Sequence, residues 1–154
     1  MLICKWEKLP AKMQTDEVRK YYDILRKKNF SLFWKRVFDI FVSVLMLVVL
    51  SPLFLVLAIA IKIDSKGPVF YRQERVTQYG KRFRIHKFRT MVSNADKIGT
   101  AVTIENDSRV TKVGRKVRRL RLDELPQLLD VLSGNMSFVG TRPEVSKYVE
   151  QYTP

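Results

Sequence analysis

The sequence predicts an α+β fold in which an apolar helix, broken near its middle, carries a small helix-rich domain with one short β-hairpin. Three features of the chain predict it. Residues 40–61 contain no charged side chain, residues 69–88 hold two strand-like segments around a turn, and residues 111–134 show helical spacing of apolar side chains. A chain of 154 residues has room for one compact domain beside the apolar helix. We therefore divide the chain into residues 1–36, 37–62 and 63–154.

The first part, residues 1–36, is predicted to be a basic amphipathic segment. Asp16 is a suitable N-cap for a helix that runs from Glu17 to about Lys28. One face of this helix is apolar and the opposite face is basic, so the helix either lies in a membrane interface or packs on the domain, and both alternatives stay open. The apolar face holds Val18, Tyr21, Tyr22 and Leu25, and the aromatic residues Phe30, Phe33, Trp34 and Phe38 follow.

Residues 40–61 are long enough to cross a bilayer, since a spanning helix needs about 20 apolar residues. Ser51 and Pro52 interrupt the stretch, because proline has no N–H and its ring clashes with the carbonyl four residues back, that of Val48. The two arms would be about 18 and 13 Å long, shorter than a hydrocarbon core of about 30 Å. The stretch is therefore either a kinked spanning helix or a re-entrant hairpin that returns to the same face.

The charged residues on both sides of the apolar stretch bear on that choice. Lys and Arg are enriched on the cytoplasmic flanks of membrane helices, and both flanks are basic here. A single span would place one basic flank on the wrong side, so the charge pattern favours the hairpin while the frequency of kinked helices favours the span. The flanking residues are Lys27, Lys28, Lys35 and Arg36 before the stretch and Lys62, Lys66, Arg72 and Arg75 after it.

The part that follows the apolar stretch is predicted to contain a hairpin. Two strands, 69–73 and 81–88, are joined through a turn at 78–80. Many Lys and Arg side chains on these strands indicate a solvated strand face near lipid. The other elements expected here are a turn at 65–68, a short helix at 93–99 and a loop at 100–108.

Residues 111–134 predict two further helices. The first is basic and extends to about Arg119. In the second, leucines repeat at helical spacing and Asp123 is a natural N-cap. Pro126 is tolerable only in the first turn of that helix, where its missing N–H needs no partner, and Gly134 suits the position just after its end.

Asp123 and Glu124 are the candidate catalytic pair. They sit at a predicted helix N-terminus, where the helix dipole and nearby arginines are expected to keep both carboxylates ionised and to gather phosphate. An ionised aspartate beside a phosphate site can attack phosphorus, and an adjacent glutamate can hold Mg²⁺. A pair of acidic residues that merely caps a helix is the alternative. The arginines just before the pair are Arg118, Arg119 and Arg121.

Composition adds two constraints. The net charge of +14 favours contact with anionic lipid headgroups or with nucleic acid. No nucleic-acid motif is recognisable, so we expect no nucleic-acid partner. The only cysteine, Cys4, excludes an internal disulfide and a cysteine metal cluster. No cleavable signal peptide is expected, because the apolar run starts too late and is too long.

From about Phe33 to the end, the chain resembles the bacterial sugar transferase family, the monotopic phosphoglycosyl transferases that begin lipid-linked glycan assembly. The order and spacing of several short motifs carry the resemblance. They are Phe38-Asp39 before the apolar run, Ser51-Pro52 within it, Gly67-Pro68-Val69-Phe70, Gln73-Glu74-Arg75, Lys87-Phe88-Arg89-Thr90-Met91, Leu122-Asp123-Glu124-Leu125-Pro126-Gln127 and Met136-Ser137-Phe138-Val139-Gly140-Thr141-Arg142-Pro143-Glu144.

The resemblance implies a reaction and a location. A re-entrant helix broken at Ser51-Pro52 would hold a cytoplasmic catalytic domain on the inner (plasma) membrane of a bacterium. Asp123 would take sugar-phosphate from a UDP-sugar, with release of UMP, and polyprenyl (undecaprenyl) phosphate would then remove the phosphosugar. Glu124 would bind Mg²⁺, the implied cofactor. The implied phosphate ligands are Arg118 and Arg142, with Lys87 and Arg89 as further contributors.

Two departures and three functional alternatives follow from the same comparison. Many relatives have glycine at Thr77 and proline at Thr141, and they continue past Pro154 through a further motif, so we expect this chain to be incomplete at its C-terminus. The alternatives are an active transferase, an inactive scaffold of the same fold, and a membrane-anchored basic protein that binds nucleic acid. A surface ion pair with Glu144 is the alternative to phosphate binding by Arg142. The identity of the sugar, the polyprenol and the oligomeric state, including a homodimer, stay open.

Overall fold

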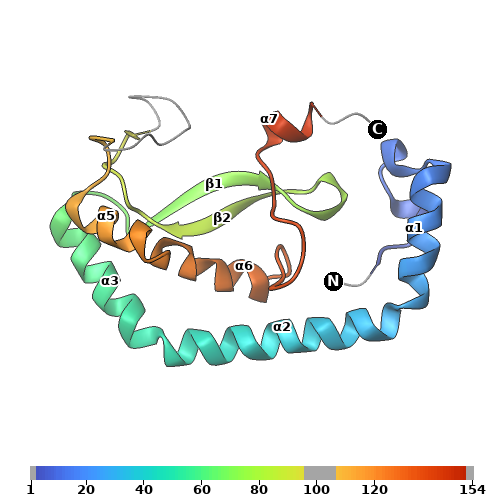
Figure 1. Cartoon of the computed structure of the whole chain (residues 1–154), viewed down its shortest axis with the longest axis horizontal. Coiled ribbons are helices and arrows are strands. Elements are labelled where there is room, and N and C mark those ends of the chain that lie inside the picture. The colour runs from blue at the N-terminus through green and yellow to red at the C-terminus, as the bar shows by residue number, and fades with distance from the viewer. Residues whose placement is uncertain (1–2, 96–106, 152–154) are drawn as a thin grey trace.

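The computed structural model describes residues 3–95 and 107–151 and shows an α+β protein, as predicted. Two long helices that meet at a bend form one side of the molecule (Figure 1). A two-stranded antiparallel sheet and several short helices lie along these two helices. The first helix of the chain stands at one end of the molecule's long axis (Figure 1).

Helix α1 (Asp16–Lys27) is the predicted N-terminal helix, although its cap is one residue earlier than predicted. The Thr15 side chain accepts a hydrogen bond from the N–H of Val18 at 3.4 Å, so Thr15 is the N-cap and Asp16 belongs to the first turn. A threonine oxygen can serve here as well as an aspartate oxygen. Two short 3₁₀ turns precede the helix, η1 (Trp6–Lys8) and η2 (Ala11–Met13).

The amphipathic helix α1 packs in part against the chain's own N-terminal segment. The rings of Trp6 and Tyr22 lie 5.1 Å apart, and the guanidinium of Arg19 lies 4.7 Å from the centre of the Trp6 ring. The Tyr22 hydroxyl donates to the carbonyl of Cys4, whose N–H in turn donates to the hydroxyl of Tyr79. The N-terminal segment therefore bridges α1 and the hairpin tip.

Helices α2 (Asn29–Val49) and α3 (Ser51–Asp64) form the broken apolar helix, with a bend of 61° between them. Pro52 lies in the first turn of α3, where a missing N–H is harmless. The Ser51 hydroxyl donates to the carbonyl of Val48 at 2.8 Å and so satisfies the carbonyl nearest the break. No single helix of the described residues is long and apolar enough to cross a membrane, whereas this bent pair meets the same criteria of length and hydropathy when its two helices are taken together.

The sheet consists of β1 (Phe70–Val76) and β2 (Arg82–Phe88), joined through η3 (Gln78–Gly80). It confirms the predicted hairpin, but β1 ends three residues later than the expected 69–73. The longer strand is explained by a tertiary contact: Val76 pairs with Glu144 from the C-terminal segment, and this pairing keeps Val76 extended. The predicted helix at 93–99 and loop at 100–108 lie largely outside the described residues. Of the part described, Ser93, Asn94 and Ser108 form turns.

The C-terminal third contains α5 (Lys112–Arg119), η4 (Leu122–Gln127), α6 (Leu128–Leu132) and α7 (Ser146–Val149). Helix α5 confirms the predicted basic helix, and Gly134 adopts a φ of 83° just after α6, as predicted. The second predicted helix is divided, because its first six residues are 3₁₀. A 3₁₀ turn accommodates Pro126 within the element.

The prediction that Asp123 is an N-cap is wrong. Leu120 is the C-cap of α5, and Arg121, with a left-handed backbone of φ 57°, separates α5 from η4. Helical backbone therefore resumes at Leu122, and Asp123 and Glu124 lie in the first turn of η4, where no side chain caps the element. Both carboxylates still lie at the positive end of the helical segment.

The buried core lies where α3 packs beneath the sheet and α5. Its fully buried members are Leu57, Ile61, Phe88 and Val117, and partly buried residues of η4 pack against them. On α2, a polar stripe faces the domain instead: Arg36 donates to the carbonyls of Val131 and Leu132 at 2.6 and 2.8 Å. Its cation at the C-terminal end of α6 complements the helix dipole and joins α2 to that helix.

Candidate active site

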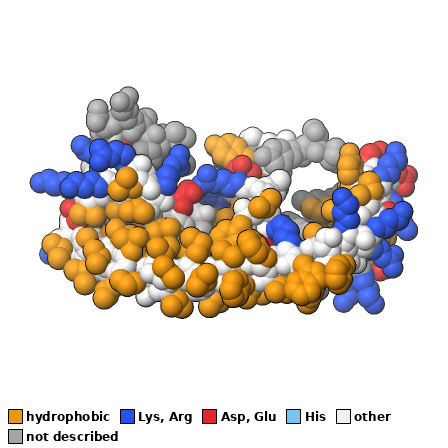
Figure 2. Space-filling view, turned by 60° about the horizontal axis from the view of Figure 1, so that its bottom comes forward, with side chains coloured by type: hydrophobic (Ala, Val, Ile, Leu, Met, Phe, Trp, Pro, Cys, Tyr) orange, Lys and Arg blue, Asp and Glu red, His pale blue; other side chains and the backbone are white. Residues whose placement is uncertain are grey.

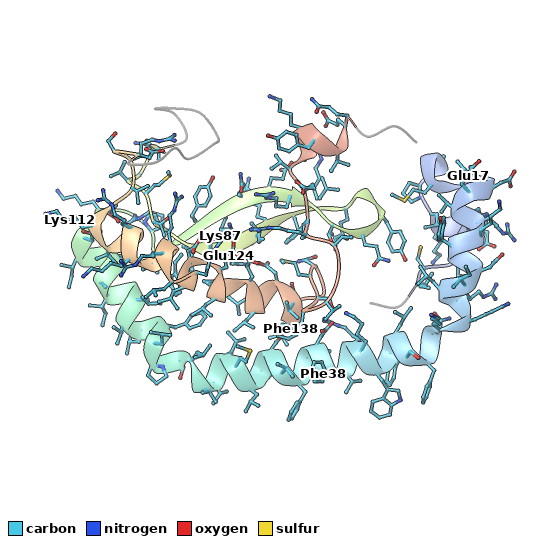
Figure 3. All side chains as sticks on the ribbon, viewed as in Figure 1. Glu17, Phe38, Lys87, Lys112, Glu124 and Phe138 are labelled. Carbon is cyan, nitrogen blue, oxygen red and sulfur yellow. The ribbon has the colours of Figure 1, made fainter. Side chains whose placement is uncertain are left out.

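The Asp123–Glu124 pair lies in the first turn of η4, directly across from β2. Glu124 is the better connected of the two. Lys87 Nζ lies 3.3 Å from Glu124 Oε1, and Arg142 Nη2 lies 2.7 Å from the same oxygen. Figure 3 shows Lys87 on β2 and Glu124 on η4 pointing toward one another. The fold thus gathers cations from two distant segments at one carboxylate.

The structure gives Arg142 a different ion-pair partner from Glu144, the alternative considered from the sequence. Its guanidinium pairs with Glu124, whereas the backbone of Glu144 binds Val76 through the bridge to β1.

The pKa values of the two carboxyls shift in opposite directions. Burial raises the pKa of Asp123, and the charge of Lys87 offsets that rise only in part, while the negative charge of Glu124 adds to it. Burial also raises the pKa of Glu124, but the charges of Lys87 and Arg142 outweigh it and leave a net lowering. The lowered pKa of Glu124 favours its ionised form, as expected, although the cations responsible are Lys87 and Arg142. The charge of Arg118 also lowers the pKa of Asp123, as expected, but burial outweighs it, and ionisation of Asp123 stays a prediction.

Arg118 comes from α5 and also borders the pair. Its Nε donates to Thr90 Oγ1 at 2.7 Å, which aligns the guanidinium with the segment just after β2. Arg118 and Asp123 line the same cleft, together with Lys87. All four predicted phosphate ligands thus lie at the carboxylate pair or at the cleft beside it: Arg142 pairs with Glu124, and Lys87, Arg89 and Arg118 line the cleft.

Arg89 borders the cleft as well, but its guanidinium is engaged by the backbone at the end of α3. Its side chain is buried, and its guanidinium donates to the carbonyls of Ile61, Ser65 and Lys66 at the end of α3. Gly67 has a φ of 126°, and a Cβ at this position would collide with the Arg89 guanidinium. Arg89 therefore closes the C-terminal end of α3, and the glycine of the Gly67-Pro68 motif makes room for it.

A cleft of about 490 Å³ opens beside Asp123, between the strands and residues 88–95. Aromatic and basic side chains line it, which suits a ligand with a ring and a charged group. Sequence reasoning did not assign Gln73 and Arg75 to the site, although the Gln73-Glu74-Arg75 motif was a signal that they mattered. Arg75 donates to Gln73 Oε1 at 2.9 Å and to the Pro143 carbonyl at 3.3 Å. Further residues of the lining are Phe70, Tyr71, Met91 and Arg109.

The donor set also bears on metal binding. Among the described residues, no three His, Cys, Asp or Glu side chains gather as a metal site. Mg²⁺, however, is usually held by one or two carboxylates with water and substrate phosphates. Asp123 and Glu124 supply oxygen donors of this kind, so the pair fits Mg²⁺ brought together with a phosphate ligand.

An acidic pair lies among Lys and Arg side chains and beside a cleft, in a domain that packs on a broken apolar helix. This chemistry suits a phosphorylated ligand. The comparison with known families is specific. The model of the bacterial sugar transferase family matches residues 30–154, so the chain belongs to that family. The resemblance drawn from the motifs is confirmed.

Curated relatives carry related names. The chain is 45% identical over 120 residues to a UDP-N-acetylgalactosamine-undecaprenyl-phosphate N-acetylgalactosaminephosphotransferase of Aeromonas hydrophila, covering 78% of this chain and 28% of the relative. It is 48% identical over 119 residues to a UDP-glucose:undecaprenyl-phosphate glucose-1-phosphate transferase of Escherichia coli K12, covering 77% of this chain and 25% of the relative. It is 49% identical over 109 residues to the exopolysaccharide production protein PSS of Rhizobium leguminosarum, covering 70% and 54%. The aligned part is thus about a quarter of the first two relatives and half of the third.

Proposed function

We propose that this chain is the catalytic part of a phosphoglycosyl transferase that moves a sugar 1-phosphate from a UDP-sugar to polyprenyl phosphate. The observation that carries the proposal is the position of Asp123 on a cleft that Lys87 and Arg118 also line. A carboxylate beside fixed cations can act as a nucleophile toward a phosphoryl group. The names of the relatives identify the donor and acceptor classes.

In the first half-reaction, a carboxylate oxygen of Asp123 attacks the phosphorus that bears the sugar. A bond forms between that oxygen and phosphorus, the bond from phosphorus to the UMP oxygen breaks, and UMP leaves with the electron pair. Arg118 and Lys87 stabilise the negative charge on the phosphoryl oxygens, as cations do in such transfers. The cleft beside Asp123 holds the nucleotide.

In the second half-reaction, a phosphate oxygen of the polyprenyl phosphate attacks the same phosphorus. The bond to Asp123 breaks, the carboxylate is regenerated, and a lipid-linked diphosphosugar leaves. The Arg142 side chain is half exposed, so its guanidinium can leave Glu124 and bind a phosphate of the ligand instead. Glu124 would hold Mg²⁺, which supplies positive charge that neutralises the phosphate oxygens when bound.

We also propose that α2 and α3 form a re-entrant hairpin, so that both ends of the broken helix face the cytoplasm at the inner membrane. One face of this pair is broadly hydrophobic (Figure 2), and exposed side chains such as Phe41, Val48 and Ile63 contribute to it. The polar residues of α2 face the domain instead, where buried Asp39 accepts a 2.7 Å hydrogen bond from the Ser137 hydroxyl. This arrangement holds Asp123 beside the headgroups, where a polyprenyl phosphate presents its phosphate. The basic surface of the chain suits anionic lipids.

The test is a reaction with purified protein in nanodiscs, polyprenyl phosphate and a panel of UDP-sugars, in which UMP release and lipid-linked product are measured. Transfer from one or more UDP-sugars is expected, with a matching dependence of both products on the lipid acceptor. Hydrolysis of UDP-sugar without lipid-linked product, or no reaction with any donor, would contradict the proposal and favour an inactive scaffold.

A further inference from the structure

A second buried contact joins the strand that carries Lys87 to the helical segment that carries the acidic pair. Asp130 lies on α6, seven residues after Asp123, and its carboxylate is 1% exposed. One carboxylate oxygen accepts from the backbone N–H of His86 at 2.8 Å, and the other lies 2.8 Å from Nδ1 of the same residue. Because a carboxylate only accepts hydrogen bonds, the Nδ1 position carries the hydrogen.

The strand geometry explains why the His86 N–H is free to meet Asp130. Hydrogen-bonded and non-hydrogen-bonded pairs alternate along an antiparallel ladder. The Val69–Arg89 position is hydrogen bonded, and Arg72 and His86, three residues away, form a non-hydrogen-bonded pair. The N–H of His86 therefore points away from β1, toward the open edge of β2. Asp130 closes that edge with a helix residue, since an unpaired strand edge is otherwise left to solvent or another chain.

His86 is followed directly by Lys87, so the two residues attach β2 to the η4–α6 segment at two points. His86 contacts Asp130, and Lys87 contacts Glu124. The two contacts differ in burial: the Asp130 side chain is 1% exposed, whereas that of Glu124 is 28% exposed. A phosphate ligand would compete for Lys87 and loosen the second contact, but it has no access to the first.

We propose that Asp130, acting through His86, is a positioning residue that fixes β2 beside η4 and thereby keeps Lys87 opposite Asp123 and Glu124. The proposal rests on the function proposed above, in which Lys87 stabilises the negative charge on the phosphoryl oxygens of the substrate. The lysine stem is long and flexible, so the location of its ammonium group depends on where the backbone of β2 is held. The buried contact between Asp130 and His86 sets that location both in the free protein and when a phosphate ligand is bound.

The first experiment measures Lys87 directly and needs no catalysis. Purified wild type, Asp130→Ala and Asp130→Asn are treated with a limiting amine-acetylating reagent, and mass spectrometry follows each lysine. An amine reacts only when neutral and accessible, so release from Glu124 is expected to raise Lys87 acetylation at least threefold in Asp130→Ala. Asn keeps the shape, its oxygen can accept from the His86 N–H, and its NH2 group can donate to Nδ1 in the other tautomer of His86, so Asp130→Asn is expected to stay within twofold of wild type. Exposed Lys81 on the same hairpin is the internal control.

The second experiment is a double-mutant cycle with Lys87→Met, using UMP release. If Asp130 acts through Lys87, Asp130→Ala lowers kcat about tenfold or more in wild type but less than twofold in the Lys87→Met background. A purely structural contribution would lower kcat by the same factor in both backgrounds, and that result would overturn the proposal. Unchanged Lys87 acetylation in Asp130→Ala would overturn it as well.

Matched variants guard against loss of the fold. If Asp130→Ala does not melt cooperatively, the same measurements are made on His86→Leu, which removes the ring contact and keeps the backbone N–H, and on His86→Asn, which restores a side-chain donor. Raised Lys87 acetylation in His86→Leu alone supports the proposal, and equal acetylation in both overturns it. If wild type transfers no sugar phosphate, the proposed function fails, while the acetylation result still decides the positioning role.

Discussion

Arg142 and Glu124, eighteen residues apart in the chain, form an ion pair of 2.7 Å in the candidate site. Lys87 donates to the same oxygen of Glu124. Two cations on one carboxylate oxygen explain the lowered pKa of Glu124, and they leave its neighbour Asp123 as the carboxyl that faces the cleft. This division suggests separate roles for the two acidic residues, which the following predictions test.

Asp123→Asn is expected to abolish UMP release, because an amide cannot attack phosphorus as a carboxylate does. Expression and membrane association should be unchanged. Wild type incubated with UDP-sugar but without polyprenyl phosphate should show a sugar-phosphate adduct on Asp123 by mass spectrometry. An adduct on another residue, or an active Asp123→Asn variant, would remove Asp123 from the nucleophile role.

The same substitution is expected to raise the melting temperature at neutral pH. Burial raises the pKa of Asp123 above its usual 3.8, so the folded state binds the Asp123 proton more tightly than the unfolded state. That favourable contribution is complete below the unfolded pKa and is lost as pH rises through the higher folded pKa. Asn resembles the protonated carboxyl, so its advantage should be largest at pH 7 and shrink toward pH 4. Equal melting temperatures for the two proteins across this range would contradict the pKa shift.

Glu124 is expected to set the Mg²⁺ requirement. Chelation with EDTA should remove activity, and added Mg²⁺ should restore it. In Glu124→Gln, a neutral amide replaces a carboxylate, so about tenfold more Mg²⁺ should be needed for half-maximal UMP release. Arg84→Ala, on the exposed face of β2, serves as the unaffected control. Full activity in EDTA would exclude the metal role.

Arg89 is expected to act on stability. Its buried guanidinium closes the end of α3 through several backbone carbonyls, and a charged hydrogen-bonding group of this kind is worth about 1.5–3 kcal/mol per hydrogen bond. Arg89→Leu should therefore lower the free energy of unfolding by about 3 kcal/mol, measured by urea denaturation. A loss below about 0.5 kcal/mol, the size usual for surface substitutions, would show that the contacts contribute little.

Cys4 reports the topology of the broken helix, because it is the only thiol in the chain. A hairpin keeps residues 1–36 in the cytoplasm, so a membrane-impermeant maleimide should label Cys4 only after the inner membrane is opened. Replacing Ser51 with Ala and Pro52 with Leu should straighten the helix and let some molecules span, which would expose Cys4 to the outside. Strong labelling of wild type in intact cells would refute the hairpin.

The chain's sequence by itself determined the features that depend on neighbouring residues. The break at Ser51-Pro52, the hairpin around residues 78–80, the helix after Thr111 and the turn at Gly134 were all predicted, because backbone chemistry and local periodicity decide them. The sequence also predicted that the acidic pair lies at the start of a helical segment, where the structure has it. Even the Ser51 contact with Val48 follows from their spacing.

Only the tertiary structure decided what depends on residues far apart in the chain. Burial against other segments gives Asp123 its raised pKa, and the return of the C-terminal segment gives Arg142 its partner. Carbonyls at the end of α3 accept hydrogen bonds from Arg89 and give it a structural role. Contact with the edge of β2 buries Asp130, and the helical spacing of apolar residues alone does not predict that burial. The physical reason is common to all of these cases: desolvation and charge pairing are set by distances in space, which the order of residues does not contain.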